Sequence, residues 1–153
     1  MEIGICFPLP TLHFPLYTSH FPLISMASES VLVACLCAQW CGVCRDYRRC
    51  FEQVRTQIQA ERPQVQFLWI DVEDEADLLE PLDVDDFPTL LLATGHDVRF
   101  FGPLVPQADM LTRMIRSQVQ CPAASTLSLP EMTALVARIR AAYPLNRIFS
   151  PKN

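Results

Sequence analysis

An unbroken apolar run, from Val31 to Ala38, occupies eight positions early in the chain and has the length of a β-strand. A run without polar alternation indicates a strand that is buried on both faces, as in a sheet covered by helices on both sides. Cys41 and Cys44 follow closely, and an apolar stripe at helical spacing then continues to Pro63. The chain must therefore fold so that a buried strand leads into a helix that begins beside two cysteines.

The rest of the chain alternates between strand and helix patterns. The first helix is predicted from residue 43 to Pro63. Three more strands are predicted at 65–71, 88–93 and 97–101, and three more helices at 73–82, 106–119 and 129–142. The first two strands and the helix between them predict a right-handed βαβ unit, and the short turn at 94–96 predicts an antiparallel hairpin. The predicted fold class is α/β, with four mixed strands flanked by helices and an extra C-terminal helix.

Residues 1–29 differ from the rest of the chain because they are rich in proline and show neither helical nor strand periodicity. We expect either a leader without stable structure or a start assigned too early, with Met26 as the natural one. A secretory signal is less favoured, because the first basic residue is Arg45 and prolines interrupt every apolar run. The predicted organisation is a domain at 30–120, followed at 121–153 by a linker, the last helix and a loose tail.

Composition excludes several classes of function. The chain has 153 residues, with 12 basic and 17 acidic side chains and a net charge of −5, which argues against binding to nucleic acid. No stretch approaches the roughly 18 apolar residues of a membrane-spanning helix, so no membrane association is predicted. Seven cysteines in a chain that can build its own core indicate a reducing compartment, and we expect a cytoplasmic protein.

The placement of Cys41 and Cys44 at a strand-to-helix junction predicts redox chemistry. The N-terminus of a helix offers unpaired N–H groups and the positive end of the helix dipole, and both stabilise a thiolate on Cys41. Cys44 lies one helical turn further in, close enough to form a disulfide. Cys41 can therefore attack a substrate disulfide, and Cys44 can resolve the mixed disulfide.

Two other interpretations of these cysteines are a structural zinc site and inert thiols. Zinc usually needs a second pair of ligands, which Cys35 and Cys37 could nominally supply. Alternate residues on a buried strand point to one face, however, and we expect these two to point away from the helix tip. No metal site is therefore predicted.

Two segments resemble the thioredoxin family. Trp40-Cys41-Gly42-Val43-Cys44 resembles its Trp-Cys-Gly-Pro-Cys motif, and Phe87-Pro88-Thr89-Leu90 resembles its Ile-Pro-Thr-Leu strand, whose proline is cis. The resemblance covers 30–119 and implies a trimmed thioredoxin-like core. It also implies a thiol–disulfide oxidoreductase that transfers electrons to protein disulfides in cell redox homeostasis. Such a protein needs no cofactor and is recycled by a thioredoxin-reductase-type partner or by a small thiol.

The resemblance assigns roles to individual residues. It implies that Cys41 is the exposed nucleophile and Cys44 the buried resolving thiol. The implied substrate-binding residues are Trp40, Gly42, Val43, Phe87, Pro88 and Thr89. A cis proline has no N–H, so it would leave neighbouring backbone groups free to pair with a substrate strand.

Three departures from the family pattern raise a second hypothesis. Cys35 stands where the family has a buried aspartate that moves a proton at the resolving cysteine, and Val43 replaces the usual proline. The family's first strand and helix have no evident counterpart in residues 1–29. Packing is the favoured role for Cys35 and Cys37, and exchange with the Cys41/Cys44 pair is the alternative. The alternative function is a thioredoxin-like chaperone or assembly factor with little redox turnover.

Overall fold

The computed structural model describes residues 30–120, 127 and 129–144. In chain order, its elements are β1 (Val31–Cys37), α1 (Gly42–Glu61), β2 (Gln66–Asp71), α2 (Ala76–Leu79), β3 (Thr89–Thr94), β4 (Asp97–Pro103), α3 (Ala108–Gln120) and α4 (Pro130–Ala142). The predictions made for 1–29, 121–126 and 145–153 fall outside the described residues. Among the described helices, none combines the length and hydropathy needed to cross a bilayer.

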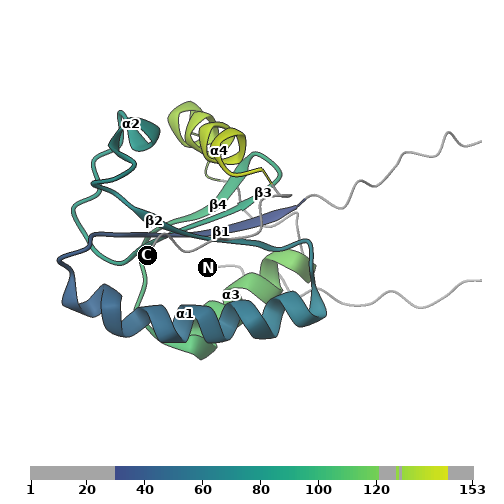
Figure 1. The fold of residues 1–153 in the computed structure, drawn as a ribbon. Helices are drawn as coiled ribbons and strands as arrows, with labels where there is room; N and C mark the ends of the chain where they lie inside the picture. The colour runs from purple at the N-terminus through teal and green to yellow at the C-terminus, as the bar shows by residue number, and fades with distance from the viewer. Residues whose placement is uncertain (1–29, 121–126, 128, 145–153) are drawn as a thin grey trace, which may run out of the picture.

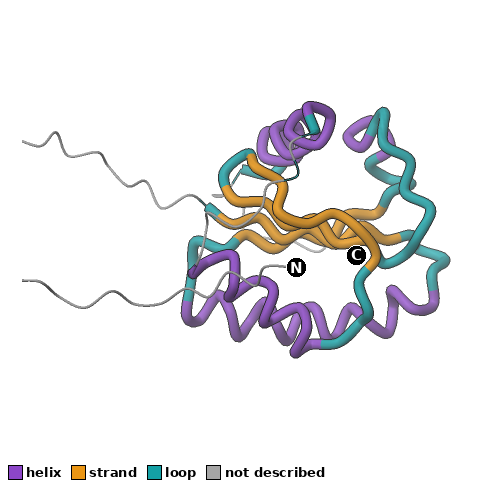
Figure 2. The backbone as a smooth tube through the Cα atoms, turned by 180° about the vertical axis from the view of Figure 1, so that it is seen from behind, coloured by secondary structure: helices purple, strands orange, loops and turns teal. Residues whose placement is uncertain are grey.

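The four strands form one mixed sheet in the order β2-β1-β3-β4. β1 pairs in parallel with β2 and antiparallel with β3, and β3 pairs antiparallel with β4. α1 and α3 cover one face of the sheet, while α2 and α4 lie on the other (Figures 1 and 2). The predicted fold class, a βαβ unit plus a hairpin flanked by helices, is therefore confirmed.

The side chains of β1 alternate between the two faces, and all seven residues of the strand are buried. Cys35 and Cys37 lie in the core cluster with side chains of α1 and α3, and we call this side of the sheet the thiol face. Leu32 and Leu36 lie in the cluster with side chains of α4, and we call this side the aliphatic face. One strand thus supplies sulfur to one layer of the core and hydrocarbon to the other.

α4 packs on the aliphatic face, as the apolar stripe predicted. Its four buried side chains are Met132, Leu135, Val136 and Ile139. Arg140 fixes the end of the helix to the sheet: its guanidinium donates to the Gly95 carbonyl at 2.8 Å and to the Ser30 carbonyl at 2.7 Å. The C-terminal helix is therefore an integral layer of the domain.

Two predicted boundaries are wrong for identifiable reasons. α2 has only four residues, not the ten of the predicted helix at 73–82, because Glu75 provides no side-chain cap and Glu80 precedes a proline. β4 does not stop before Gly102 and Pro103, because Gly102 pairs with Leu90 and Pro103 with Thr89. Gly102 has a φ of 157°, which a glycine adopts without a side-chain clash.

Candidate active site

β1 ends at Cys37 and leads into α1, which begins at Gly42 (Figure 1). Cys41 stands at the start of that helix. It is the N-cap residue of α1, and its Sγ accepts a hydrogen bond from the backbone N–H of Cys44 at 3.2 Å. The N–H of Cys41 donates in turn to the Ala38 carbonyl at 3.0 Å, which closes the turn between strand and helix. An otherwise unpaired N–H of the helix start is thus directed at Cys41 Sγ, where it favours negative charge.

The two cysteines differ in burial less than the sequence suggested. Cys41 is 7% exposed and Cys44 is 2% exposed, so their order is as expected, but Cys41 is not an exposed residue. The expectation was wrong because Cys41 packs into the same core cluster as Cys37 and Ala38. Its neighbour Val43 is 52% exposed, so an apolar side chain faces solvent beside Cys41.

The electrostatic environment holds Cys44 in its neutral form. Burial, followed by hydrogen bonds with Cys41 and Cys37, raises the pKa of the Cys44 thiol above its ordinary value. A thiol with a raised pKa keeps its proton at neutral pH and is a poor first nucleophile. The two sulfurs therefore lie in different environments. Cys41 Sγ accepts a backbone N–H, whereas Cys44 stays protonated as a thiol.

Trp40 forms an aromatic rim beside the two cysteines. It is 66% exposed, and its indole N–H donates to Glu73 Oε1 at 3.1 Å. Its ring meets the edge of Phe87, with centroids 5.6 Å apart and an interplanar angle of 89°. These contacts hold a large apolar surface open to solvent, next to the turn that carries Cys41.

The segment around Pro88 adopts the geometry that the resemblance implied. The Phe87–Pro88 peptide bond is cis. Pro88 is buried, and its carbonyl accepts the N–H of Leu104 at 3.5 Å. The buried Thr89 hydroxyl donates to the Asp86 carbonyl at 2.7 Å. That hydroxyl is therefore engaged within the domain, and any substrate contact at Thr89 would involve its backbone.

Four thiols gather in one cluster on the thiol face. Cys35 and Cys37 share it with Cys41 and Cys44, and the Sγ atoms of Cys35 and Cys37 are 3.4 Å apart. The expectation that the strand thiols point away from the helix tip is wrong, because α1 packs directly over their side of the sheet. Among the residues that the structure describes, no group of three or more potential ligands is arranged to hold a metal ion.

The thioredoxin family model matches residues 16–115, more than half of the 153-residue chain. The chain belongs to the thioredoxin family. The match spans the βαβ unit and the hairpin and ends within α3. The family assignment predicted from the Trp-Cys-x-x-Cys and Phe-Pro-Thr segments is thereby confirmed. The comparison with curated protein sequences gave no match.

Several solved structures share this fold. The zinc-bound form of human ERp44 is 22% identical, with a TM-score of 0.52 over 60% of this chain and 28% of that chain. Thioredoxin from Trypanosoma brucei brucei is 24% identical, with a TM-score of 0.50 over 60% of this chain and 77% of that chain. The germline-specific thioredoxin Deadhead of Drosophila melanogaster is 20% identical, with a TM-score of 0.50 over 58% of this chain and 81% of that chain. Our chain therefore spans less than a third of ERp44.

Two residues of this thioredoxin-family site escaped the sequence analysis. Glu73, which anchors Trp40, is one acid among many in an acidic stretch. Tyr47 reads as an ordinary apolar position of α1, yet its buried hydroxyl has no hydrogen-bond partner within the described residues. Burial first, and then the nearby Cys35, raise the pKa of Tyr47 above its ordinary value. Neither role has a local sequence signal, because both depend on contacts between distant elements.

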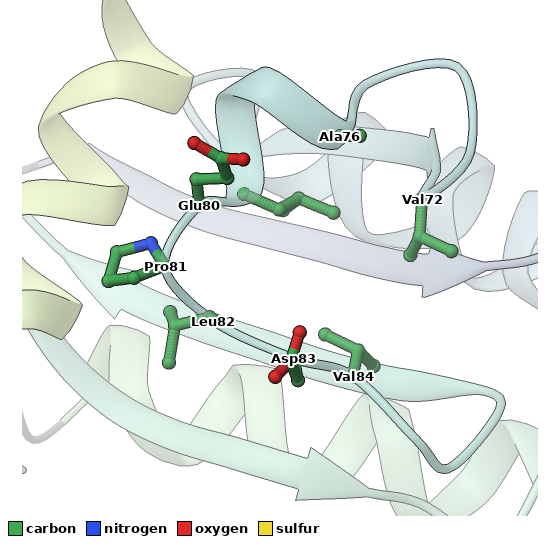
Figure 3. A pocket seen from close by; sticks show the side chains of 8 residues that line it. Val72, Ala76, Glu80, Pro81, Leu82, Asp83 and Val84 are labelled. Atoms are coloured by element: carbon green, nitrogen blue, oxygen red, sulfur yellow. The ribbon is translucent and has the colours of Figure 1, made fainter.

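A hollow of about 490 Å³ lies apart from the cysteines, between α2 and the segment that follows it (Figure 3). Its lining combines the apolar side chains of Val72, Leu79 and Val84 with the carboxylates of Glu80 and Asp83. The residues that line it include no cysteine, and the hollow belongs to the aliphatic side of the thioredoxin fold. The redox-capable groups of the described residues are instead concentrated at the β1–α1 junction.

Proposed function

We propose that this thioredoxin-family domain is a thiol–disulfide oxidoreductase that reduces disulfides in other proteins. The observation that carries the proposal is the N-cap position of Cys41, whose Sγ accepts the N–H of Cys44 at 3.2 Å. That geometry directs a helix N–H at the attacking sulfur and keeps Cys44 one helical turn away, where it can resolve a mixed disulfide. The two cysteines together hold the electron pair that the reaction transfers.

The proposed reaction has two exchange steps. The Cys41 thiolate attacks one sulfur of the substrate disulfide, forms a mixed disulfide and releases the other sulfur as a thiolate, which takes up a proton. Cys44 then loses its proton and attacks Cys41 Sγ, which frees the second substrate thiol. The substrate gains two electrons and two protons, and the protein is left with a Cys41–Cys44 disulfide. No metal or organic cofactor is needed for this balance.

The exposed surface around the cysteine pair suits a protein substrate. Trp40 and Val43 are 66% and 52% exposed, and Gly42 between the cysteines is also exposed. Phe87 packs against Trp40, so the flat apolar surface extends toward the Pro88 segment. A substrate strand that lies across this surface would bring its disulfide to Cys41.

Catalytic turnover requires that the Cys41–Cys44 disulfide be reduced again. We assign this step to a thioredoxin-reductase-type partner or to a small thiol. The cysteine-rich composition fits the reducing environment of the cytoplasm, where either reductant would be present.

One observation favours a second function, in which the domain binds client proteins as a chaperone or assembly factor. The exposed apolar surface at Trp40 could hold a client without any electron transfer. In that case, binding would depend on Trp40 and would not depend on the sulfur of Cys41.

An insulin-reduction assay with dithiothreitol as the electron source separates the two functions. We expect the wild-type chain to accelerate the reduction of insulin and the Cys41→Ser variant to lose the acceleration, because serine cannot form the mixed disulfide. Cys50→Ser is the matched control, since Cys50 lies on α1 but outside the strand-to-helix junction. Equal activity of wild type and Cys41→Ser would contradict the proposed enzyme and leave the binding function.

A further inference from the structure

The proposed reaction uses two of the four clustered thiols and leaves Cys35 and Cys37 unexplained. Both are almost fully buried, at 0% and 2% exposure, and their Sγ atoms are only 3.4 Å apart. Their positions at alternate residues of β1 direct both sulfurs to the thiol face, beneath the start of α1. Two adjacent thiols under a redox pair are positioned for exchange as well as for packing.

Cys44 connects the strand thiols to the active pair. It lies in the same cluster as the other three cysteines, and its backbone N–H bonds to Cys41 Sγ. Hydrogen bonds with both Cys41 and Cys37 contribute to the raised pKa of its thiol. Cys37 bonds in turn to Cys35. The four cysteines therefore share one buried cluster that runs from the turn before α1 into β1.

We propose that Cys35 and Cys37 are a second dithiol that exchanges with the Cys41/Cys44 pair through Cys44, so that one fully reduced domain can reduce two substrate disulfides. This inference rests on the proposed function, because the first disulfide arises when Cys41 and Cys44 reduce a substrate. It assigns the strand cysteines a chemical role in place of simple packing.

The exchange is balanced within the protein. Cys37 loses its proton and attacks Cys44 Sγ, so that a Cys37–Cys44 bond forms, the Cys41–Cys44 bond breaks and Cys41 leaves as a thiolate. Cys35 then loses its proton and attacks Cys37 Sγ, which forms a Cys35–Cys37 bond and releases Cys44. The two released sulfurs take up the two protons. Cys41 and Cys44 are again a dithiol and can reduce a second substrate disulfide.

The final bond would form at the end of β1. Residues two apart on an extended strand have Cα atoms about 6.6 Å apart, which lies within the roughly 4.4–6.8 Å span of a disulfide. The two Sγ atoms are in contact at 3.4 Å. Side-chain rotation does not move the Cβ atoms, which must come within about 3.5–4.5 Å of each other, so the bond also requires the end of β1 to bend. The pairing of β1 with β3 ends at Leu36, so Cys37 is paired only with β2. Cys37 is at the end of the strand, where only the Val72 N–H bonds its carbonyl beyond the sheet ladder.

Tyr47 lies in the same core cluster as the four cysteines. Its hydroxyl lacks a hydrogen-bond partner among the described residues, and burial keeps it protonated by raising its pKa. Cys35 and Cys37 are among the groups whose charge acts on it. A thiolate formed at either sulfur would therefore lie near an unoccupied O–H donor, which lowers the cost of the intermediate.

Burial also determines how the second dithiol can be oxidised. Neither strand thiol is accessible to an external disulfide, since both lie beneath α1. Oxidation must therefore enter at Cys41 and pass through Cys44. A Cys41→Ser variant should leave Cys35 and Cys37 reduced under the same treatment, even though both residues are unchanged.

The decisive experiment counts electrons in the full-length chain. The background variant carries serine at the three remaining cysteines, Cys6, Cys50 and Cys121. It is fully reduced, freed of reductant, mixed anaerobically with excess oxidised insulin, quenched in acid and alkylated. Intact mass counts the thiols that remain. We expect all four to be lost as two intramolecular disulfides, with two insulin disulfides reduced per chain.

The other results of this count overturn the inference in distinguishable ways. Loss of two thiols, with Cys35 and Cys37 both alkylated, leaves the proposed function intact and shows that the strand thiols only pack. Loss of no thiol and reduction of no insulin overturns the proposed function and the inference together.

Peptide mapping identifies the bonds. Trypsin cannot separate the four cysteines, because the first basic residue of the chain is Arg45. Cleavage after Leu36 and Trp40 by chymotrypsin places Cys35, Cys37 and the Cys41/Cys44 pair on three different peptides. In Cys35→Ala, we expect the electron count to fall to one disulfide per chain, shared between Cys41–Cys44 and Cys37–Cys44 linkages.

Tyr47→Phe keeps all four thiols and tests the route between them. We expect the first insulin disulfide to be reduced at the wild-type rate and the second at least several-fold more slowly. An unchanged rate for the second insulin disulfide would show that Tyr47 takes no part in the exchange. If Cys35→Ala formed only the Cys41–Cys44 disulfide, Cys37 would take no part in it either.

Discussion

The two faces of the sheet are built from the same strand but from different chemistry. On the aliphatic face, Leu32 and Leu36 of β1 pack under the hydrocarbon side chains of α4. On the thiol face, Cys35 and Cys37 of β1 lie with the cysteines of the α1 turn. Both layers exclude solvent from the strand, because all seven of its residues are buried.

The difference shows that stability and redox chemistry place different requirements on the buried side chains of one strand. A leucine contributes more hydrocarbon to a core than a cysteine does, so a layer built only for stability gains nothing from sulfur. The aliphatic face has the hydrocarbon side chains that stability favours. The thiol face instead has cysteines at two alternate residues of the strand, beneath the redox pair. We therefore expect substitutions on the aliphatic face to change stability and substitutions on the thiol face to change electron transfer.

The largest expected effect is the removal of α4 by truncation after Gln120. Four side chains of α4 are buried on the sheet, and each contributes roughly 1.5–3 kcal/mol when fully buried. Their loss is comparable with the whole stability of a typical domain, about 5–15 kcal/mol. We expect the truncated chain to be largely unfolded at 25 °C, as measured by near-ultraviolet circular dichroism and urea titration.

Truncation after Pro144 is the matched control, because it keeps every described contact of α4. An α4-deleted chain that melts at the wild-type temperature would show that the aliphatic face does not need its helix.

Two single substitutions, one on each face, compare the contributions of the faces to stability and to electron transfer. Leu135→Ala should lower the free energy of unfolding by about 2–5 kcal/mol, because it leaves a cavity beneath α4. Cys35→Ala, on the opposite face and equally buried, should cost only about 1 kcal/mol. The redox readouts should be reversed: folded Leu135→Ala keeps the wild-type electron count per chain, and Cys35→Ala loses half of it. Denaturant titration and thiol counting on the same samples provide both numbers. Equal losses of stability in the two variants would contradict the proposal that the aliphatic face serves stability and the thiol face serves electron transfer.

The fold was predictable because the strand and helix signals of this chain are strong and local. The apolar run of β1, the turn near Gly95 and the stripe of α4 each specify an element without help from the rest of the molecule. The candidate pair Cys41 and Cys44 was predictable for the same reason, since a strand-to-helix junction is visible in the sequence.

The arrangement of the thiols was less predictable, because it depends on which helix covers which face of β1. Periodicity placed Cys35 and Cys37 on one face but could not say that α1 packs over that face. The burial of Cys41 and the open Tyr47 hydroxyl depend on the same packing. Long-range contacts between elements, rather than local pattern, decide these features.

The smallest expected effect is a pH dependence of stability to which the thiol face contributes. Burial raises the pKa of Cys44 above the ordinary thiol value of 9.0, and hydrogen bonding and burial do the same for Cys37. Above about pH 9, the unfolded chain releases these protons while the folded chain keeps them, so stability falls as pH rises. A Cys41–Cys44 disulfide has no proton to lose, and the oxidised domain should show a shallower fall. The tyrosines titrate in both forms, so their contribution cancels in the comparison. Melting temperatures of the reduced and oxidised chain, measured anaerobically from about pH 8 to about pH 10.5, test this. Parallel curves would show that the Cys44 thiol does not couple protonation to folding.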